Sequence, residues 1–179
     1  AEDFRIFNLN ITTDSSVYFA TEPSRRLRVI ITPTWSWYGA AGGVSFIGSF
    51  SAGEETPCWV FSSLLENNPK FIAEAISHEV GHTLGLNHQS VYDSDCELVH
   101  EYAPGRGVGE LSWAPIMGLG YFQNITTWPT GTSFDGCAVI QNDIDIIAGP
   151  QNNFGLRKDD HAATLGDATP VTFESAGFS

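Results

Sequence analysis

Three histidines and one glutamate recur in a short stretch at a spacing that suits a metal ion. Residues 78–88 read His-Glu-Val-Gly-His-Thr-Leu-Gly-Leu-Asn-His. On a helix His78 and His82 lie one turn apart on the same face, so both imidazoles can reach one ion. Gly85 permits the left-handed backbone that ends a helix, so the chain can turn back and present His88 as a third ligand. Three protein ligands and an open position are typical of catalytic zinc, whereas four indicate a structural site.

Glu79, which follows the first of these histidines, points to hydrolysis. In an H-E-x-x-H helix the glutamate acts as a general base and is not a ligand. Zinc lowers the pKa of a coordinated water, and Glu79 would take the proton as that water attacks a carbonyl. The sequence therefore predicts one catalytic zinc ion held by His78, His82 and His88, with Glu79 as the catalytic residue.

A second motif lies downstream, where residues 113–118 read Trp-Ala-Pro-Ile-Met-Gly and contain the only methionine, Met117. A long zinc motif followed by a tight turn with a methionine is the metzincin pattern. From about Gly42 to Asp145 the chain resembles metzincin zinc endopeptidases, and it is similar to their secreted bacterial members of the reprolysin-like or pappalysin-like type. The resemblance implies that the turn at Met117 forms an apolar floor under the histidines and orients them.

The fold that this resemblance implies is of the α/β class. It has a twisted, mostly parallel sheet with an antiparallel edge strand over the active-site helix. A small irregular C-terminal subdomain follows, with the methionine turn (the Met-turn) and a C-terminal helix. The family's first strand and first helix have no counterpart here, and we expect that they lay upstream or that other contacts replace them. Residues 1–150 are then the catalytic domain, and residues 151–179 are a polar C-terminal extension or a linker.

The sequence pattern also places individual elements. Asn68 and Pro69 suit the start of a helix, which we expect to run over residues 69–84. Isoleucines at helical spacing predict a last helix over residues 136–148, unless a separate short helix begins at Asn142-Asp143. Alternating or β-branched stretches predict strands over four ranges, namely residues 7–12, 26–32, 43–50 and 58–61.

The substrate of such an enzyme is expected to bind extended and to add a strand to the edge of the sheet. The candidate edge is residues 43–50, and its first four residues, Gly43, Val44, Ser45 and Phe46, are the predicted substrate contacts. Glycines at this edge would let a second backbone approach closely.

A pocket beyond the scissile bond is expected between the zinc helix and residues 118–128. Some metzincins place a tyrosine two residues after the methionine, where it can reach zinc. Here Tyr121 stands four residues after Met117, so no ligand role is carried over. Tyr121 either lines the pocket with Phe122 and Trp128 or packs in the core.

The three cysteines, Cys58, Cys96 and Cys137, are an odd number and have no C-x-x-C spacing, which argues against a thiolate metal site. We favour a Cys96–Cys137 disulfide, because both residues follow the zinc helix. Cys58 is then free and buried, or it pairs outside this chain. Asp93, Asp95 and Glu97 form an acidic cluster whose oxygens could hold calcium. The alternative is a solvated loop, because no complete twelve-residue calcium loop is present.

Composition narrows the function classes. The 179 residues carry a net charge of −13 and are 42% hydrophobic, which is typical of a folded domain. The acidic balance argues against nucleic acids and anionic membranes as partners. No apolar run reaches the length of about 18 residues that a membrane span needs. The acidic N-terminus has no features of a signal peptide, so we expect a mature product or an excised domain.

The sequence thus predicts a zinc metalloendopeptidase that acts on protein or peptide substrates, and the resemblance implies a secreted, extracellular or periplasmic location. The missing N-terminal segment or a pro-segment are further expected partners. A zinc hydrolase with a non-peptide substrate is one alternative. An inactive binding or adhesion module of a larger secreted protein, stapled by zinc, is another. Retention of Glu79 argues against the inactive module, because a structural site has no use for a general base.

Overall fold

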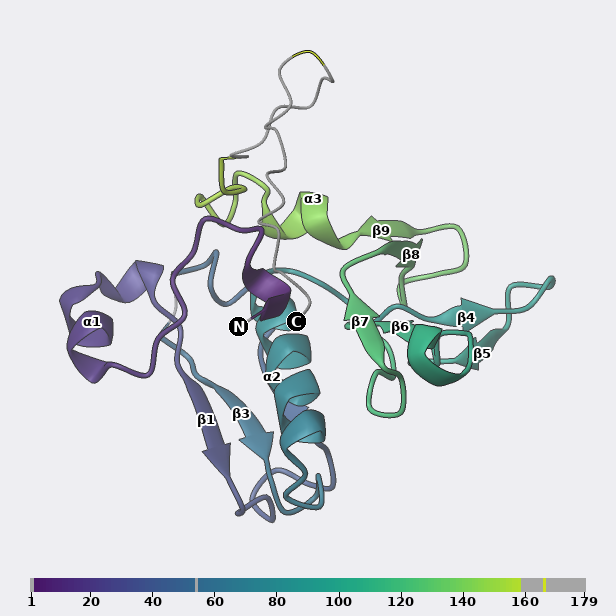
Figure 1. Cartoon of the computed structure of the whole chain (residues 1–179), viewed down its shortest axis with the longest axis horizontal. Coiled ribbons are helices and arrows are strands. Elements are labelled where there is room, and N and C mark those ends of the chain that lie inside the picture. The colour runs from purple at the N-terminus through teal and green to yellow at the C-terminus, as the bar shows by residue number, and fades with distance from the viewer. Residues whose placement is uncertain (1, 54, 159–165, 167–179) are drawn as a thin grey trace, which may run out of the picture.

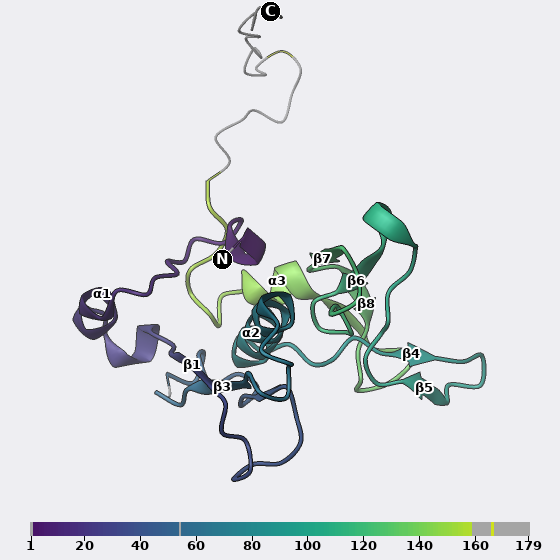
Figure 2. The ribbon, with the colours of Figure 1, turned by 60° about the horizontal axis from the view of Figure 1, so that its bottom comes forward.

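The computed structural model describes residues 2–53, 55–158 and 166. A single long helix, α2 (Pro69–Thr83), stands between the two halves of the chain (Figure 1). Most elements that precede it in sequence lie on one side, and those that follow it lie on the other, as the second view also shows (Figure 2). The helix is therefore positioned to present residues to a boundary between the two halves.

Short helices and strands make up the remainder of the fold. The elements before α2 are η1 (Glu2–Phe4), α1 (Ser15–Ala20), η2 (Pro23–Arg25), β1 (Val29–Thr32), β2 (Gly43–Val44) and β3 (Cys58–Phe61). The elements after α2 are β4 (Val91–Tyr92), β5 (Leu98–His100), η3 (Gly109–Leu111), β6 (Trp113–Pro115), β7 (Ile125–Thr127), β8 (Thr130–Thr132), β9 (Ile140–Asn142) and α3 (Asp143–Ile147). At this coarse level the predicted mixed α/β class is confirmed.

The sheet beside α2 has three strands in the order β1-β3-β2. Strand β1 pairs with β3 in parallel, and Val29 lies opposite Cys58. Strand β2 pairs with β3 antiparallel, with Gly43 opposite Val60. Because β2 is at the edge of this sheet, one side of its backbone has no strand partner among the described residues.

Helix α2 has the ends that the sequence predicts. The side chain of Asn68 caps it by accepting a hydrogen bond from the amide of Lys70 at 2.9 Å, and Pro69 occupies the first turn. After Thr83 the backbone reverses at Gly85, whose φ of 102° lies in the left-handed region. The amide of Leu86 then bonds the carbonyl of Gly81 at 3.1 Å, which turns the chain back under the helix.

Two apolar clusters pack against α2. One holds Val60, Leu65 and Ala75 and joins the helix to the sheet. The larger joins the end of the helix to η1, α3 and the second half of the chain, and its buried members are Phe4, Phe7, Leu84, Leu86, Ile116, Met117, Trp128 and Ile147. Burial of such side chains contributes roughly 1.5–3 kcal/mol each, so α2 is held rigidly along its length.

The second half of the chain is built from pairs of short strands. Strands β4 and β5 form an antiparallel hairpin, β6 pairs with β7 in parallel, and β8 pairs with β9 antiparallel. A disulfide joins Cys96 to Cys137 across 41 residues, as favoured from the sequence, and Cys58 is buried and free in this chain. The disulfide ties the tip of the β4–β5 hairpin to the segment before β9.

Two predicted strands are wrong. Residues 8–12 form no strand, and Phe7 makes only an isolated bridge with Leu156, because this segment runs past the C-terminal residues of the domain instead of along the sheet. The predicted strand over residues 43–50 ends after Val44. The amide of Gly48 instead bonds the carbonyl of His82 at 2.9 Å, so the segment turns at Gly48 (φ 74°) and folds against the end of α2.

The last predicted helix is also wrong in extent, although the alternative start at Asn142 is confirmed. Residues 140–142 pair with β8, and only Asp143–Ile147 are helical. The side chain of Asn142 caps α3 by accepting from the amide of Asp145. Helix α1 was not predicted, because its six residues are too few to show helical periodicity.

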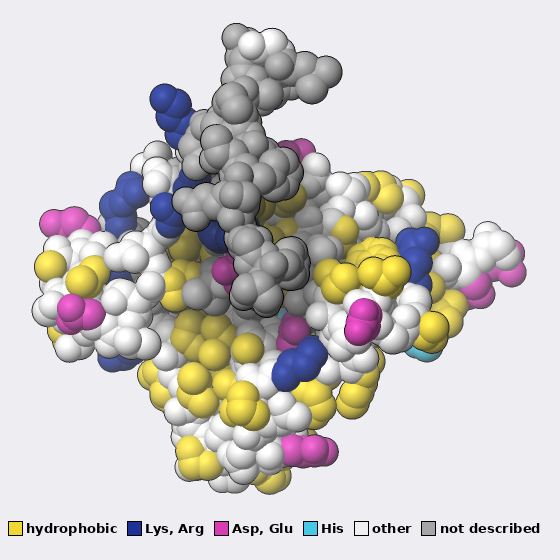
Figure 3. All heavy atoms as spheres, in the orientation of Figure 1, with side chains coloured by type: hydrophobic (Ala, Val, Ile, Leu, Met, Phe, Trp, Pro, Cys, Tyr) yellow, Lys and Arg dark blue, Asp and Glu magenta, His cyan; other side chains and the backbone are white. Residues whose placement is uncertain are grey.

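On the face shown in Figure 3, Lys and Arg side chains gather on the side where α1 lies, and hydrophobic side chains gather lower down, in the region of β1 and β3. Among the described residues, no helix combines the length and hydrophobicity needed to cross a bilayer. Residues 159–165 and 167–179 of the predicted extension lie outside the described residues.

Candidate metal centre

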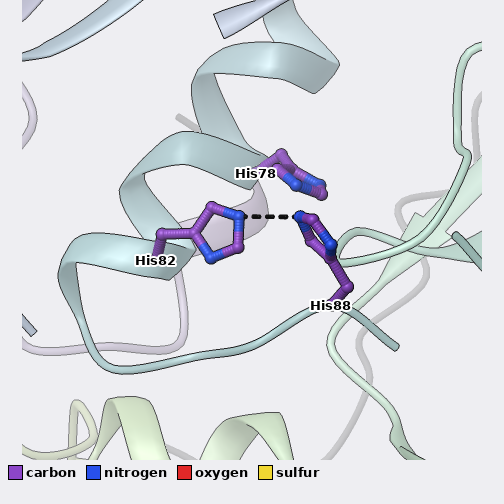
Figure 4. A group of neighbouring side chains, drawn as sticks. All are labelled: His78, His82 and His88. Atoms are coloured by element: carbon purple, nitrogen blue, oxygen red, sulfur yellow. Dashed lines mark hydrogen bonds between the residues drawn. The ribbon is translucent and has the colours of Figure 1, made fainter. Parts of the chain in front are cut away.

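The three predicted ligands converge at the C-terminal end of α2. His78 and His82 project from successive turns of the helix, and the backbone reversal brings His88 to face them (Figure 4). One potential ligand nitrogen from each imidazole lies within 4.8 Å of the other two. Among the described residues this is the one group of three or more His, Cys, Asp or Glu side chains with such geometry.

The second nitrogen of each ring is held by a hydrogen-bond acceptor. His78 Nδ1 donates to the carbonyl of Ile116 at 2.8 Å, and His82 Nδ1 donates to the carbonyl of Leu86 at 2.7 Å. His88 Nδ1 lies 3.0 Å from Glu101 Oε1. These acceptors place the ring protons on Nδ1, so the Nε2 lone pairs are left to point inward.

The inward nitrogens fit a cation. His82 Nε2 and His88 Nε2 are 3.1 Å apart, close to the separation of about 3.4 Å expected for two imidazoles bound to one tetrahedral zinc ion. With both protons on Nδ1, two lone pairs face each other at this distance, which is repulsive unless a positive ion lies between them. The donor set of three neutral imidazoles suits zinc.

Burial favours the neutral form of the histidines that metal binding requires. Burial, together with the neighbouring imidazoles, lowers the pKa of His78 to about 3. Burial likewise lowers the pKa of His82 to about 4. The pKa of His88 is lowered by burial as well, although the Glu101 carboxylate opposes this shift. At neutral pH all three rings are therefore uncharged.

Glu79 lines the same cleft as the three histidines, but its carboxylate is not part of the group that could hold a metal ion. Its side chain is 7% exposed, and Ser45 Oγ donates to its Oε2 at 2.6 Å. Burial raises the pKa of Glu79 to about 7, while the Ser45 hydrogen bond lowers it. A carboxylate poised near neutrality beside a metal site is suited to accept and return a proton.

A cleft of about 490 Å³ opens beside the histidines. Its walls are one face of α2, the strand edge that includes β2, and the segment around Tyr121. Of the five predicted substrate contacts, Gly43, Val44, Ser45 and Tyr121 line this cleft. Phe46 is not among the lining residues, and it is 65% exposed, because the chain has already turned away from the strand at that point.

The glycine at the strand edge has a direct steric reason. A Cβ on Gly43 would lie 2.7 Å from Glu79 Cγ and 2.7 Å from the carbonyl oxygen of Trp59. Only a residue without a side chain lets the edge strand pass this close to the glutamate.

Met117 is fully buried behind the centre and packs against α2 at Gly81, between the two helical histidines in sequence. One alternative from the sequence placed Trp128 in the lining of the pocket, and this prediction is wrong. Trp128 is buried in the larger core cluster, where its indole nitrogen donates to the carbonyl of Asp3 at 2.7 Å. Phe122 is exposed and contacts Phe71, and it does not line the cleft either.

Asp93, Asp95 and Glu97, which the sequence offered as a possible calcium site, do not bring their carboxylates together around one point. Asp93 Oδ1 instead accepts hydrogen bonds from the amides of Asp95 and Glu97, both at 2.9 Å. The Asp93 carboxylate stabilises the tip of the β4–β5 hairpin, and nothing in its surroundings supports a calcium site.

Two residues that the sequence did not single out belong to the centre. Glu101 orients His88, and the ring of Tyr102 packs against that imidazole at a tilt of 41°, with centroids 4.2 Å apart. Tyr102 also lines the cleft, and burial together with the nearby carboxylates of Glu101 and Glu79 raises its pKa to about 12. Both residues come from an irregular segment, so no sequence pattern could have located them.

Comparison with known proteins agrees with this geometry. Residues 29–137 match the family model described as Metallo-peptidase family M12B Reprolysin-like, and the matched range contains α2 and all three histidines. No curated protein and no solved structure matches the chain. Since the match covers more than half of the 179 residues, the chain belongs to the reprolysin-like M12B metallopeptidases, a family of metzincin-type zinc metalloproteases.

Proposed function

We propose that this protein is a secreted zinc endopeptidase that hydrolyses internal peptide bonds of extended substrates. The observation that carries the proposal is the convergence of three neutral imidazoles beside a buried glutamate on the wall of an open cleft. His78, His82 and His88 would hold the ion. When bound, zinc supplies a Lewis acid that makes water more acidic and polarises a carbonyl.

Glu79 is the proposed general base. Its carboxylate takes a proton from the attacking water and later delivers it to the leaving amine. Ser45 holds one carboxylate oxygen through a 2.6 Å hydrogen bond, and so restricts the orientation of the carboxylate. The backbone carbonyl of Glu79 also accepts from the same hydroxyl at 2.9 Å, which locks the Ser45 side chain in place.

The substrate main chain is proposed to pair with the free edge of β2. This edge lines the cleft and has no strand partner on its outer side among the described residues. Main-chain hydrogen bonds to a sheet edge hold a peptide extended without regard to its side chains. Side-chain selection then falls to the cleft walls, which include Tyr121.

Met117 is proposed to act as the apolar floor of the centre. It is fully buried, and its carbonyl accepts a hydrogen bond at 2.8 Å from the amide of Gln89, the residue after His88. This contact ties the methionine turn to the third ligand. The residue would thus limit the positions that the imidazoles can adopt.

A secreted location is supported by the Cys96–Cys137 disulfide. Such bonds persist in oxidising compartments and are rare where thiols are kept reduced.

The proposal is tested on purified protein with zinc and a mixed peptide library. The wild-type protein is expected to bind about one zinc ion and to cleave peptides, and a chelator should abolish cleavage until zinc is restored. The variant Glu79→Gln should keep the zinc and lose cleavage by several orders of magnitude. Exposed Glu110→Gln is the matched control and should behave like wild type.

Two outcomes would contradict the proposal. If Glu79→Gln cleaved at the wild-type rate, the assigned base would be wrong. If zinc-loaded wild-type protein cleaved no peptide, the inactive zinc-stapled module would be the better description.

A further inference from the structure

The cleft extends along α2 away from the histidines and reaches a second carboxylate. The lining residues of the helix are Glu74, Ala75, His78, Glu79 and His82, which lie on one face because they recur at helical spacing. Glu74 precedes His78 by one turn, about 6 Å along the helix axis. A side chain that enters the cleft beside the metal centre and follows the helix would therefore end at Glu74.

One oxygen of Glu74 is already occupied. Lys70 Nζ donates to Oε1 at 3.1 Å, and Thr126 Oγ1 donates to the same oxygen at 3.3 Å. No residue in the described part of the chain donates to Oε2. In the described part of the chain, the fully buried polar side-chain atoms without a hydrogen-bond partner are Ser49 Oγ, Asp143 Oδ2 and Asn152 Oδ1. Glu74 Oε2 is not one of them, although it has no donor, so it is not fully buried. Glu74 Oε2 is thus an unpaired acceptor that remains accessible.

Gly120, on the wall of the cleft that faces Glu74, leaves the Oε2 atom of Glu74 uncovered. A Cβ on Gly120, which also lines the cleft, would sit 2.9 Å from Glu74 Oε2. The carbonyl of Gly120 accepts from Lys70 Nζ at 3.1 Å, so the lysine ties this wall to the helix. A side chain at position 120 would cover the free oxygen, and glycine does not.

The charges around this end of the cleft favour a cation. The ammonium of Lys70 is bound on the Oε1 side, while the carboxylate of Asp3 lies near enough to raise the pKa of Glu74. Burial is the largest cause of the raised pKa, and Lys70 opposes it. Lys70 therefore balances the charge of Glu74, and Asp3 adds a further negative charge in a protein whose net charge is −13. A positively charged donor is the partner that such an acceptor binds most strongly.

We infer that Glu74 makes this cleft select a lysine or arginine side chain at the substrate residue directly beyond the scissile bond. The inference rests on the proposed endopeptidase function. The aliphatic stem of the substrate side chain would lie along Ala75 and Tyr121, and its charged end would donate to Glu74 Oε2. An acidic side chain would place a second negative charge against Glu74 and is expected to be a poor substitute.

The test compares peptides that differ only at the residue after the scissile bond, with arginine, lysine, glutamine or norleucine there. For the zinc-loaded wild-type protein we expect kcat/KM to be at least about tenfold higher for arginine and lysine than for norleucine. Glu74→Gln should reduce that ratio by about tenfold, because the charge of the acceptor is lost. Glu110→Gln, at an exposed position, should leave the ratio unchanged.

A ratio measured within one preparation does not depend on how much of the variant is folded. A second readout uses the inert Glu79→Gln protein with zinc and measures Kd for the arginine and norleucine peptides by calorimetry. Tighter binding of the arginine peptide, lost when Glu74→Gln is added, would support the inference without turnover.

Three results would overturn the selection. The first is equal use of arginine and norleucine, the second is an unchanged ratio in Glu74→Gln, and the third is a preference for glutamine over both basic side chains. Failure of every peptide to be cleaved would instead contradict the proposed function. The binding comparison would then still decide whether Glu74 selects a basic side chain.

Discussion

The sulfur of Met117 packs directly on the backbone of Gly81, the residue before the second helical histidine. A Cβ placed on Gly81 would lie 2.5 Å from Met117 Sδ and 3.2 Å from the ring of Trp128. Because Gly81 has no side chain, the turn that contains Met117 can approach α2 between the two helical histidines. The helix and the turn are matched to each other at this one position.

Gly81→Ala is expected to destabilise the protein, although alanine is the better helix former by about 1 kcal/mol. The added methyl group would overlap Met117, and overpacking of a buried site typically costs about 1–3 kcal/mol. The free energy of unfolding, measured with denaturant, should fall despite the gain in helix propensity. Adding Met117→Ala should restore part of the loss by making room for the methyl group. A single variant as stable as wild type would show that this contact is not tight.

Gly43→Ala is expected to lower kcat/KM by at least about tenfold with zinc content unchanged. The new Cβ would meet Glu79 and the Trp59 carbonyl of the paired strand, so either the glutamate or the edge strand must shift. The same change at Gly166, where a Cβ meets no described residue within 4 Å, is the control. Full activity in Gly43→Ala would show that the edge strand does not constrain the base.

Glu101→Gln is expected to weaken zinc binding by about tenfold, at the lower end of what outer partners of metal ligands contribute. The carboxylate holds His88 Nδ1 at 3.0 Å, but it is 45% exposed, so water can replace part of its effect. Zinc affinity is measured by competition with a chromophoric chelator. Glu97→Gln in the β4–β5 hairpin is the control, and equal affinities for the two variants would remove Glu101 from the centre.

Asp143→Asn is expected to change how stability depends on pH. The Asp143 side chain is 0% exposed, and burial raises its pKa to about 6 from the usual 3.8. The folded state therefore holds its proton more tightly than the unfolded state does, and this residue's contribution to stability falls as pH rises from about 4 to about 6. Above that range the buried charge is a constant penalty, of the order of 3 kcal/mol.

The asparagine variant lacks this titration. The free energy of unfolding of the variant minus that of wild type should therefore increase from pH 4 to pH 7.5. Both proteins are measured by denaturant titration at each pH. An Asp145→Asn variant, at an exposed position of the same helix, should show no such trend. A constant difference between Asp143→Asn and wild type across this range would show that the carboxyl group is not perturbed by burial.

Helix α2 and the convergence of the three histidines could be predicted from the sequence because their determinants are local. Asn68 and Pro69 set the start of α2, the spacing of His78 and His82 places both on one face, and Gly85 permits the reversal that returns His88. Each of these effects acts over a few residues, within one or two helical turns. The same local logic located the start of α3 at Asn142.

The strands were predicted less well because pairing depends on residues far away. The alternating pattern after Gly43 predicted a strand to residue 50, yet the carbonyls of His82 and Thr83 bind the amides of Gly48 and Phe50 and turn the segment aside. Phe7 has the burial expected of a strand residue, but its neighbour is Leu156 and no ladder forms. Apolar alternation shows which side chains seek the core and does not show which backbone will pair with them.

The sequence by itself indicated the family and predicted His78, His82 and His88 as metal ligands and Glu79 as general base, since these predictions depend on residue types at short, fixed spacings. Only the tertiary structure decided that Glu101 and Tyr102 contact His88, that Met117 packs on Gly81, and that Glu74 lines the same cleft as the histidines. These contacts join segments separated by irregular chain. Their partners are selected by packing and by the satisfaction of buried polar groups, which no local pattern records.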